Sequence, residues 1–230
     1  EAWMRATITN SPATWKILAS SVSMTPMFFD FTHPVIAPLL PPGFPPQLQT
    51  RMSLNVDQYD GFPNKRAELL DFIADAGNTH IIAGDIHASF VTSHGNGVAE
   101  FAGASVSSRS FQDAIMRSVL QDPVLSAIPG IEALIDMTPL LLQVSSSDPA
   151  HSSSYIQDLA TDVHGYVMIE VDGDGVEAEF CHIDEQYLGT NLYAHPDLDS
   201  FFDCTSYDAA DLDADGLPDK WEHATFGNIF

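Results

Sequence analysis

The segment Gly84-Asp85-Ile86-His87 places two metal-binding side chains two positions apart. A carboxylate suits calcium, magnesium or manganese, and a neutral imidazole suits iron or zinc. Two unlike ligands at this spacing therefore fit a mixed metal site that activates water. An isolated Gly-Asp-x-His also fits an aspartate that caps a turn and a histidine that satisfies a hydrogen bond. The motif alone leaves both interpretations open.

A second set of ligand types, over residues 211–222, matches the pattern of an EF-hand calcium loop. The oxygen ligands would come from six residues, with Leu217 using its backbone carbonyl: Asp211, Asp213, Asp215, Leu217, Asp219 and Glu222. Pro218 departs from helix-loop-helix EF-hands, and the segment resembles the aspartate-rich, thrombospondin type 3-like loops of exported proteins. We expect a structural Ca²⁺ that orders residues 208–226, the alternative being an acidic disordered tail.

The elements around Asp85 and His87 have the periodicities of a layered α/β fold. Asn64 is expected to cap a helix that runs to Ala76, with Leu69, Phe72, Ile73 and Ala76 on one face and Gly77 ending it. Residues 80–83 form a short apolar strand, and the Gly84–His87 turn follows its carboxyl end, where ligands collect in such folds.

Other segments predict a buried strand within residues 13–22 and an irregular surface segment over residues 26–50, which contain seven prolines. Helices are expected over residues 110–121, capped by Ser110, and over 131–143, interrupted at Pro139. Alternating apolar residues on either side of Asp172-Gly-Asp-Gly175 predict a β-hairpin over residues 166–180.

Composition excludes several classes of function. The chain has 230 residues, and 32 acidic against 8 basic residues give a net charge of −24, a field that repels nucleic acid and anionic membranes. No apolar run is long enough to span a bilayer. The acidity favours a secreted, extracellular or periplasmic location. Cys181 and Cys204 belong to no zinc pattern, and they either pair or remain two separate buried thiols.

Several motifs together resemble the C-terminal half of PhoD-type alkaline phosphatases, within the calcineurin-like metallophosphoesterases. The motifs that carry the resemblance, in chain order, are Ala13-Thr-Trp-Lys-Ile-Leu18, Asp57-Gln-Tyr-Asp-Gly-Phe-Pro63 with Arg66, Gly84-Asp-Ile-His-Ala-Ser-Phe90, Glu100-Phe101, Ser105-Val-Ser-Ser108 and His164-Gly-Tyr166. Their order and spacing are more specific than any one motif.

The resemblance implies a calcineurin-like sheet sandwich flanked by helices and a centre that contains Fe³⁺ and Ca²⁺. By position, Asp85 would bind calcium and His87 iron. The other ligands of the family precede the Ala13 segment, and neither Cys181 nor Cys204 replaces the iron-binding cysteine. The resemblance therefore implies that an upstream segment or a companion chain completes the site.

The expected activity is hydrolysis of phosphate monoesters or diesters, with residues 1–187 as the C-terminal half of the phosphatase domain and 188–230 as an acidic extension. The alternative is a catalytically inactive, calcium-stabilised extracellular module with a phosphatase-like half-fold. Asp57, Tyr59 and Asp60 are interpreted as structural, and His94 as a solvated loop residue.

Overall fold

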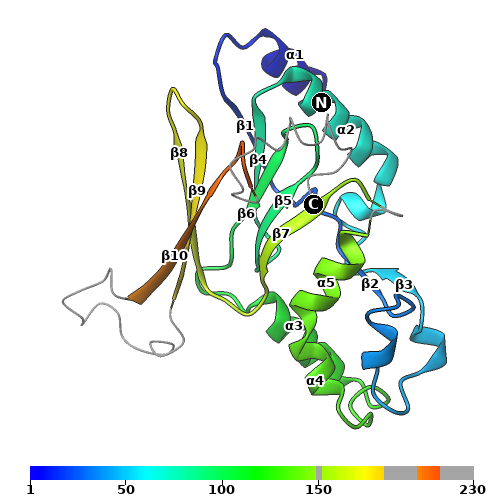
Figure 1. Cartoon of the computed structure of the whole chain (residues 1–230). Coiled ribbons are helices and arrows are strands. Elements are labelled where there is room, and N and C mark those ends of the chain that lie inside the picture. Colours follow the sequence, from blue (N-terminus) through cyan, green and yellow to red (C-terminus); the bar gives the residue numbers. More distant parts are fainter. Residues whose placement is uncertain (149–151, 184–200, 213–230) are drawn as a thin grey trace.

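A five-stranded sheet forms the centre of the computed structural model, which describes residues 1–148, 152–183 and 201–212 (Figure 1). Strands β1, β4 and β6 are parallel, whereas β5 is antiparallel to β6 and β7. In spatial order the strands are β1 (Lys16–Ser20), β4 (Thr79–Ala83), β6 (Ala99–Ala102), β5 (Ser89–Ser93) and β7 (Tyr155–Ala160). Every residue of β5 and β6 is buried, because both faces of the sheet are covered.

Helices cover one face of this sheet. Leu69 and Ile73 of α2 (Pro63–Ala76) pack with Ile81 of β4, while a larger apolar cluster joins Phe90 and Ile156 to the remaining helices. Those helices are α3 (Phe111–Gln121), α4 (Ile131–Asp136) and α5 (Thr138–Ser146), and α1 (Ala2–Asn10) lies beside α2. None of the helices in the described ranges has the length and apolarity needed to cross a membrane.

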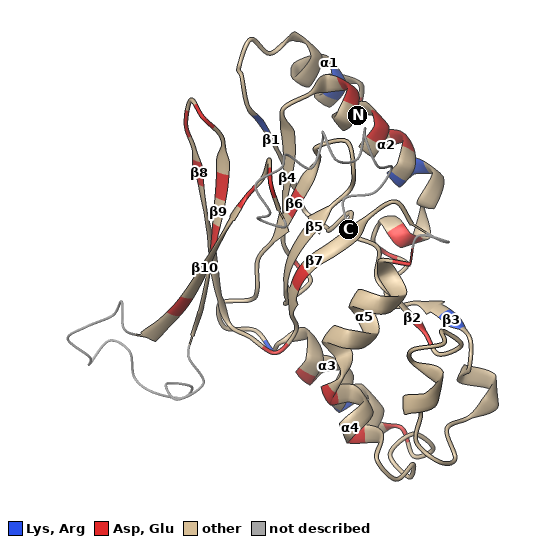
Figure 2. Cartoon of the chain, viewed as in Figure 1, with Lys and Arg blue, Asp and Glu red and all other residues tan. Residues whose placement is uncertain are grey.

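A second, three-stranded antiparallel sheet covers the other face. Val91 and Phe101 of the central sheet pack against Ala178 and Phe180 of the second. Its strands, in spatial order, are β10 (Phe202–Asp208), β9 (Val176–Ile183) and β8 (Gly165–Val171). This confirms the predicted layered α/β fold and the β-hairpin. Acidic residues are spread over the hairpin and the helices, with few basic residues between them (Figure 2).

Strand β10 comes from the predicted extension 188–230, yet it pairs with β9 and packs as part of the domain. A disulfide joins Cys204 to Cys181, at directly opposed positions of the two strands, so the two cysteines are paired. Ala209 and Leu212 are buried in the same apolar cluster as Phe101. The described part of the extension therefore belongs to the second sheet, and the boundary after residue 187 stays a prediction.

Strand β1 is less buried than its sequence predicts. It lies at an edge of the central sheet, and only β4 pairs with it among the described residues. Its residues alternate between partly buried and exposed, with Ile17 36% exposed. The apolar and β-branched composition of residues 13–22 indicated a strand correctly, but composition does not distinguish an edge from a centre.

The proline-rich segment is irregular, as predicted, but it is not merely a surface segment. It contains η1 (Ala37–Leu39), η2 (Pro46–Leu48) and β2 (Phe28–Asp30), which pairs with β3 (Arg51–Ser53). Met27, Phe29, Phe31, Ile36 and Phe44 are buried in the cluster that includes α4 and α5. Prolines exclude long α-helices and central strands, yet the apolar residues between them still fill the core.

Two helix boundaries depart slightly from expectation. Helix α2 begins at Pro63, without a side-chain cap from Asn64, because proline is favourable in the first turn. It ends at Ala76, and Gly77 follows with a positive φ of 62°. The helix predicted over residues 131–143 divides at Met137 into α4 and α5, with Pro139 in the first turn of α5. Ser110 caps α3 as predicted, accepting a hydrogen bond from the Asp113 backbone N–H.

His80 on β4 should make the stability of the protein depend on pH. Burial lowers its pKa from 6.5 to about 4. Between these values the unfolded chain binds more protons than the folded one, so stability falls as the pH decreases through this window. We expect a loss of about 2 kcal/mol from this group between pH 7.5 and pH 5.

Urea unfolding of the protein and of His80→Gln at both pH values measures this contribution. The comparison at pH 7.5 records the cost of the substitution itself, and the variant should then lose about 2 kcal/mol less on acidification. An equal loss in the two proteins would show that His80 does not contribute.

Candidate functional site

The Gly84–His87 turn directly follows the carboxyl end of β4, as its sequence predicts. Asp85 and His87 have positive φ angles of 69° and 60°, which are uncommon for residues with a side chain. Ile86 between them is buried in the main apolar cluster, whereas Asp85 is exposed and His87 is partly exposed. Burial of Ile86 anchors the turn, and such strained backbone is concentrated at functional sites.

The imidazole of His87 is fixed by the loop that precedes α3. Its Nδ1 lies 2.8 Å from the backbone carbonyl oxygen of Arg109. A carbonyl oxygen only accepts, so Nδ1 carries the hydrogen and donates it. In the neutral ring, Nε2 then keeps its lone pair. The backbone N–H of Phe111 also donates to the His87 carbonyl over 2.9 Å, so two hydrogen bonds join the turn to this loop.

The loop over residues 105–110 also contacts the start of β8. His164 Nε2 lies 2.9 Å from the Ser108 carbonyl, and the Gly165 N–H donates to the Ser105 carbonyl over 3.2 Å. A polar pocket of about 400 Å³ opens here, and its lining does not include Asp85 or His87. The residues that line it are Ser107, Ser108, Arg109, Ser110, Gln112, Asp113, Met116, Asp136, Asp162 and His164. Three motifs that are distant in sequence thus meet beside His87: Gly84–His87, Ser105–Ser108 and His164–Tyr166.

The predicted calcium loop lies almost entirely outside the described residues. Only Asp211 and Leu212 are described, and the Asp211 N–H donates to the Asp208 carbonyl over 3.3 Å. The other predicted ligands, Asp213, Asp215, Leu217, Asp219 and Glu222, fall in the undescribed range 213–230, so the loop stays a prediction.

One group of potential metal-binding atoms in the described ranges belongs to Glu179, Cys181 and Cys204, which lie within 4.8 Å of one another. The two sulfur atoms are joined in the disulfide and provide no thiolate. This group is therefore not a metal site.

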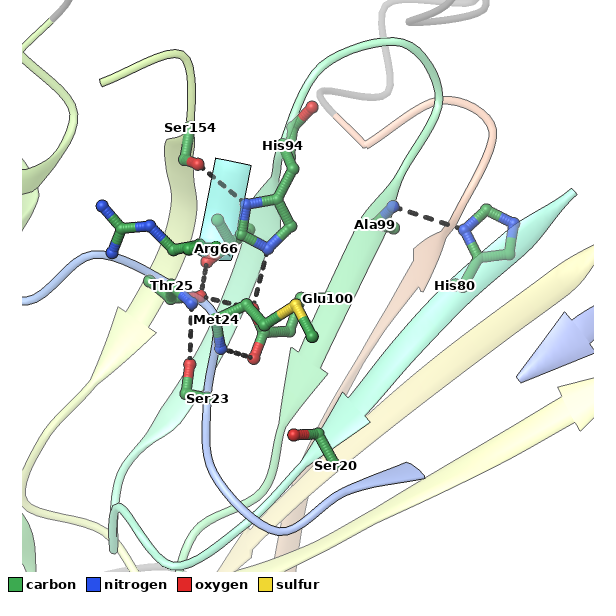
Figure 3. Close-up of polar contacts among 12 residues, drawn as sticks. Ser20, Ser23, Met24, Thr25, Arg66, His80, His94, Ala99, Glu100 and Ser154 are labelled. Carbon is green, nitrogen blue, oxygen red and sulfur yellow. Dashed lines mark hydrogen bonds and ion pairs between the residues drawn. The ribbon is translucent and has the colours of Figure 1, made fainter. Parts of the chain in front are cut away.

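Glu100 and His94 form a buried polar network that the sequence did not reveal (Figure 3). Both side chains are fully buried, and His94 Nε2 lies 2.7 Å from the Glu100 carboxylate. That carboxylate also accepts from the Met24 N–H over 2.9 Å and the Thr25 hydroxyl over 3.0 Å, and His94 Nδ1 lies 2.8 Å from the Ser154 hydroxyl. The interpretation of His94 as a solvated loop residue was wrong, because the backbone after β5 turns its ring inward.

The charge of Glu100 is stabilised where it is buried. Burial raises the pKa of Glu100, but hydrogen bonds from His94, Ser23 and Met24 outweigh it and hold the pKa below its ordinary value. The network joins β5, β6 and the segment after β1. Its role is to fix the central sheet, and it lies away from the Asp85 turn.

Asp60 is structural, in agreement with the sequence interpretation. Its carboxylate accepts from the Met27 N–H over 2.8 Å and pairs with Arg66 of α2. These contacts join η3 (Tyr59–Gly61) to the proline-rich segment and to α2.

Comparison with known proteins gives the family. No curated protein sequence matches the chain. A solved structure of PhoD aligns with 90% of this chain at 17% sequence identity and a TM-score of 0.48, covering 32% of the PhoD chain. The chain thus spans about a third of the length of that protein. The sequence profile of PhoD-like phosphatases matches residues 1–180. The chain therefore belongs to the PhoD-like phosphatase family.

Proposed function

We propose that this chain supplies Asp85 and His87 to the active site of a metal-dependent phosphoesterase that hydrolyses phosphate monoesters or diesters. The observation that supports this most strongly is the hydrogen bond from His87 Nδ1 to the Arg109 carbonyl. Metal-binding histidines commonly donate their second ring N–H to a carbonyl in this way. A histidine with a purely structural role does not require a lone pair on Nε2 for binding a metal.

The two residues fit the metals that the family resemblance implies. His87 presents an imidazole nitrogen with its lone pair, which suits iron, and Asp85 presents an exposed carboxylate, which suits calcium. Iron and calcium, when bound, supply positive charge that polarises phosphoryl oxygens and acidifies water. The Arg109 carbonyl keeps the proton on Nδ1, and Ile86 keeps the turn in place.

Further ligands would come from an upstream segment or a companion chain, because the family resemblance places them ahead of the Ala13 segment. The phosphate ester is then the substrate that both parts bind. A catalytically inactive module is the other candidate, and activity measurements separate the two.

Hydrolysis of p-nitrophenyl phosphate and of bis(p-nitrophenyl) phosphate by the full-length protein tests this function. We expect activity that chelation removes and that added iron with calcium restores, because charge stabilisation depends on the metals. Asp85→Asn should lower the rate by about a hundredfold or more and raise the calcium concentration needed for reactivation. A folded protein without activity under any metal condition would support the inactive module.

We propose that the protein is exported. The Cys181–Cys204 disulfide supports this, because disulfides persist mainly in oxidising compartments outside the cytosol. The strongly acidic composition is consistent with work in external water that contains calcium.

We further propose that residues 211–222 bind a structural Ca²⁺. The support is the sequence pattern, in which carboxylates, Gly216 and Glu222 occupy the positions that calcium loops require. Calcium at millimolar concentration should protect the C-terminal region from proteolysis, and Glu222→Gln should weaken this protection strongly by removing the bidentate ligand. Equal proteolysis with calcium and with chelator would contradict the assignment.

A further inference from the structure

We propose that a cavity at the beginning of β4 binds a small organic molecule that has an apolar ring and one acceptor oxygen, such as a cyclic ketone. The indole N–H of Trp15 and the imidazole N–H of His80 would donate to that oxygen. The cavity lies at the opposite end of β4 from Asp85 and His87, and the proposal does not rest on the phosphoesterase function.

The cavity has a volume of about 180 Å³. Apolar walls come from α2, from the turn before β6 and from the residues after β10. The lining residues are Trp15, Ile73, Ala74, Gly77, Asn78, Thr79, His80, Asn96, Gly97, Val98, Ala209 and Ala210. An apolar cavity of about 150 Å³ in another protein takes up benzene, so this volume accommodates a six-membered ring.

Two buried nitrogen atoms of lining residues have no hydrogen-bond partner within the described parts of the chain. They are Nε1 of Trp15 and Nε2 of His80, a residue that is 3% exposed. The two rings lie together, with centroids 5.9 Å apart. Buried polar groups in folded proteins are nearly always paired, since an unpaired one costs about 1–3 kcal/mol. Two such atoms on residues that line one cavity point to a ligand as their partner.

The tautomer of His80 determines whether the partner must accept or donate a hydrogen bond. The backbone N–H of Ala99 donates to His80 Nδ1 over 3.3 Å, and Figure 3 shows the other ring nitrogen directed away from Ala99. Nδ1 is therefore the acceptor, and Nε2 of the neutral ring carries the hydrogen. Burial lowers the pKa of His80 to about 4, so the ring is neutral near pH 7.

Both unpaired atoms are thus N–H donors, and the indole nitrogen never accepts. A ligand with an acceptor oxygen satisfies them, whereas a cationic donor does not. Asp208 acts electrostatically on His80, and its negative charge disfavours a carboxylate ligand. The two donors and the nearby negative charge therefore select a neutral acceptor on an apolar body.

Titration with cyclohexanone, followed by the indole ¹H–¹⁵N signals of the full-length protein, tests the proposal. The sequence has three tryptophans, and Trp3→Phe and Trp221→Phe identify the Trp15 signal by elimination. We expect a saturable downfield shift of the Trp15 Nε1–H. Trp15→Phe keeps an aromatic ring but removes the donor, and it should weaken cyclohexanone binding by up to about tenfold.

Benzene and cyclohexanecarboxylate are the matched probes in the unsubstituted protein, so the test does not depend on the folding of a variant. Both should bind at least about tenfold more weakly than cyclohexanone. Benzene lacks an acceptor oxygen, and cyclohexanecarboxylate carries a negative charge. Equal binding of benzene would show apolar filling only. No response of Trp15 up to the solubility limit of cyclohexanone would show that the cavity holds water alone, and either result overturns the proposal.

Discussion

Replacement of His87 by Ala should reduce phosphoesterase activity by more than about a hundredfold while the protein stays folded. Mutation of a group that only orients a metal ligand already lowers metal affinity or activity by about 10–100-fold. Loss of the ligand itself should have a larger effect. His87 is only partly buried, and its side chain makes one hydrogen bond to the Arg109 carbonyl, so the structural cost is small. Initial rates with saturating p-nitrophenyl phosphate, together with bound iron measured per protein, give the effect.

His33→Asn is the matched control, because the His33 ring accepts a local hydrogen bond from the Val35 N–H and the residue lies in the proline-rich segment. It should keep both activity and iron. If His87→Ala retains its iron and most of its rate, His87 is not a ligand. If the variant loses its near-ultraviolet circular dichroism together with its activity, the residue has a structural role instead.

Replacement of Glu100 by Ala should destabilise the protein by about 3–5 kcal/mol, the range for removal of one partner of a buried pair. The change leaves the Met24 N–H without its acceptor, removes one of the two acceptors near the Thr25 hydroxyl, and creates a cavity between β6 and the segment after β1. Urea unfolding at pH 7.5 measures the difference in free energy.

Glu100→Gln is the matched control, because the amide keeps the shape and one acceptor oxygen. His94 is then able to accept at Nε2 and donate from Nδ1 to the Ser154 hydroxyl, so the loss should be about 1–2 kcal/mol. In the original protein the carboxylate stabilises the fold above its unfolded pKa of about 4.3, and this stabilisation is lost as the pH falls towards the lower folded pKa. Equal stability of all three proteins would refute the structural importance of the network.

The sequence predicted the turn at Asp85 and His87 because a helix ending in glycine, a short apolar strand and a Gly-Asp-x-His motif occur in direct succession. All of these are local signals. The hairpin of β8 and β9 and the cap at Ser110 were predictable for the same reason.

What the sequence did not reveal depends on contacts between distant segments. The bond from His87 to Arg109 joins residues 22 positions apart, and the burial of His94 depends on Ser154, 60 positions away. Edge position is another such property, since β1 has the composition of a central strand but lacks a second partner among the described strands. No periodicity encodes these features.

The packing of the proline-rich segment has a consequence for the order of folding during synthesis. The N–H groups of Phe28 and Asp30 donate to the Ser146 and Ser145 hydroxyls, which follow 118 and 115 residues later. At about 5–20 residues per second, the ribosome needs on the order of 10 s to add that length. The aromatic residues of the segment can pack against one another during this interval, but they lack Leu141 and Leu142 of α5, so the nascent chain leaves this side of the cluster exposed until α5 emerges. Folding of this region is therefore completed late, and it depends on contacts of high sequence separation that slow the search.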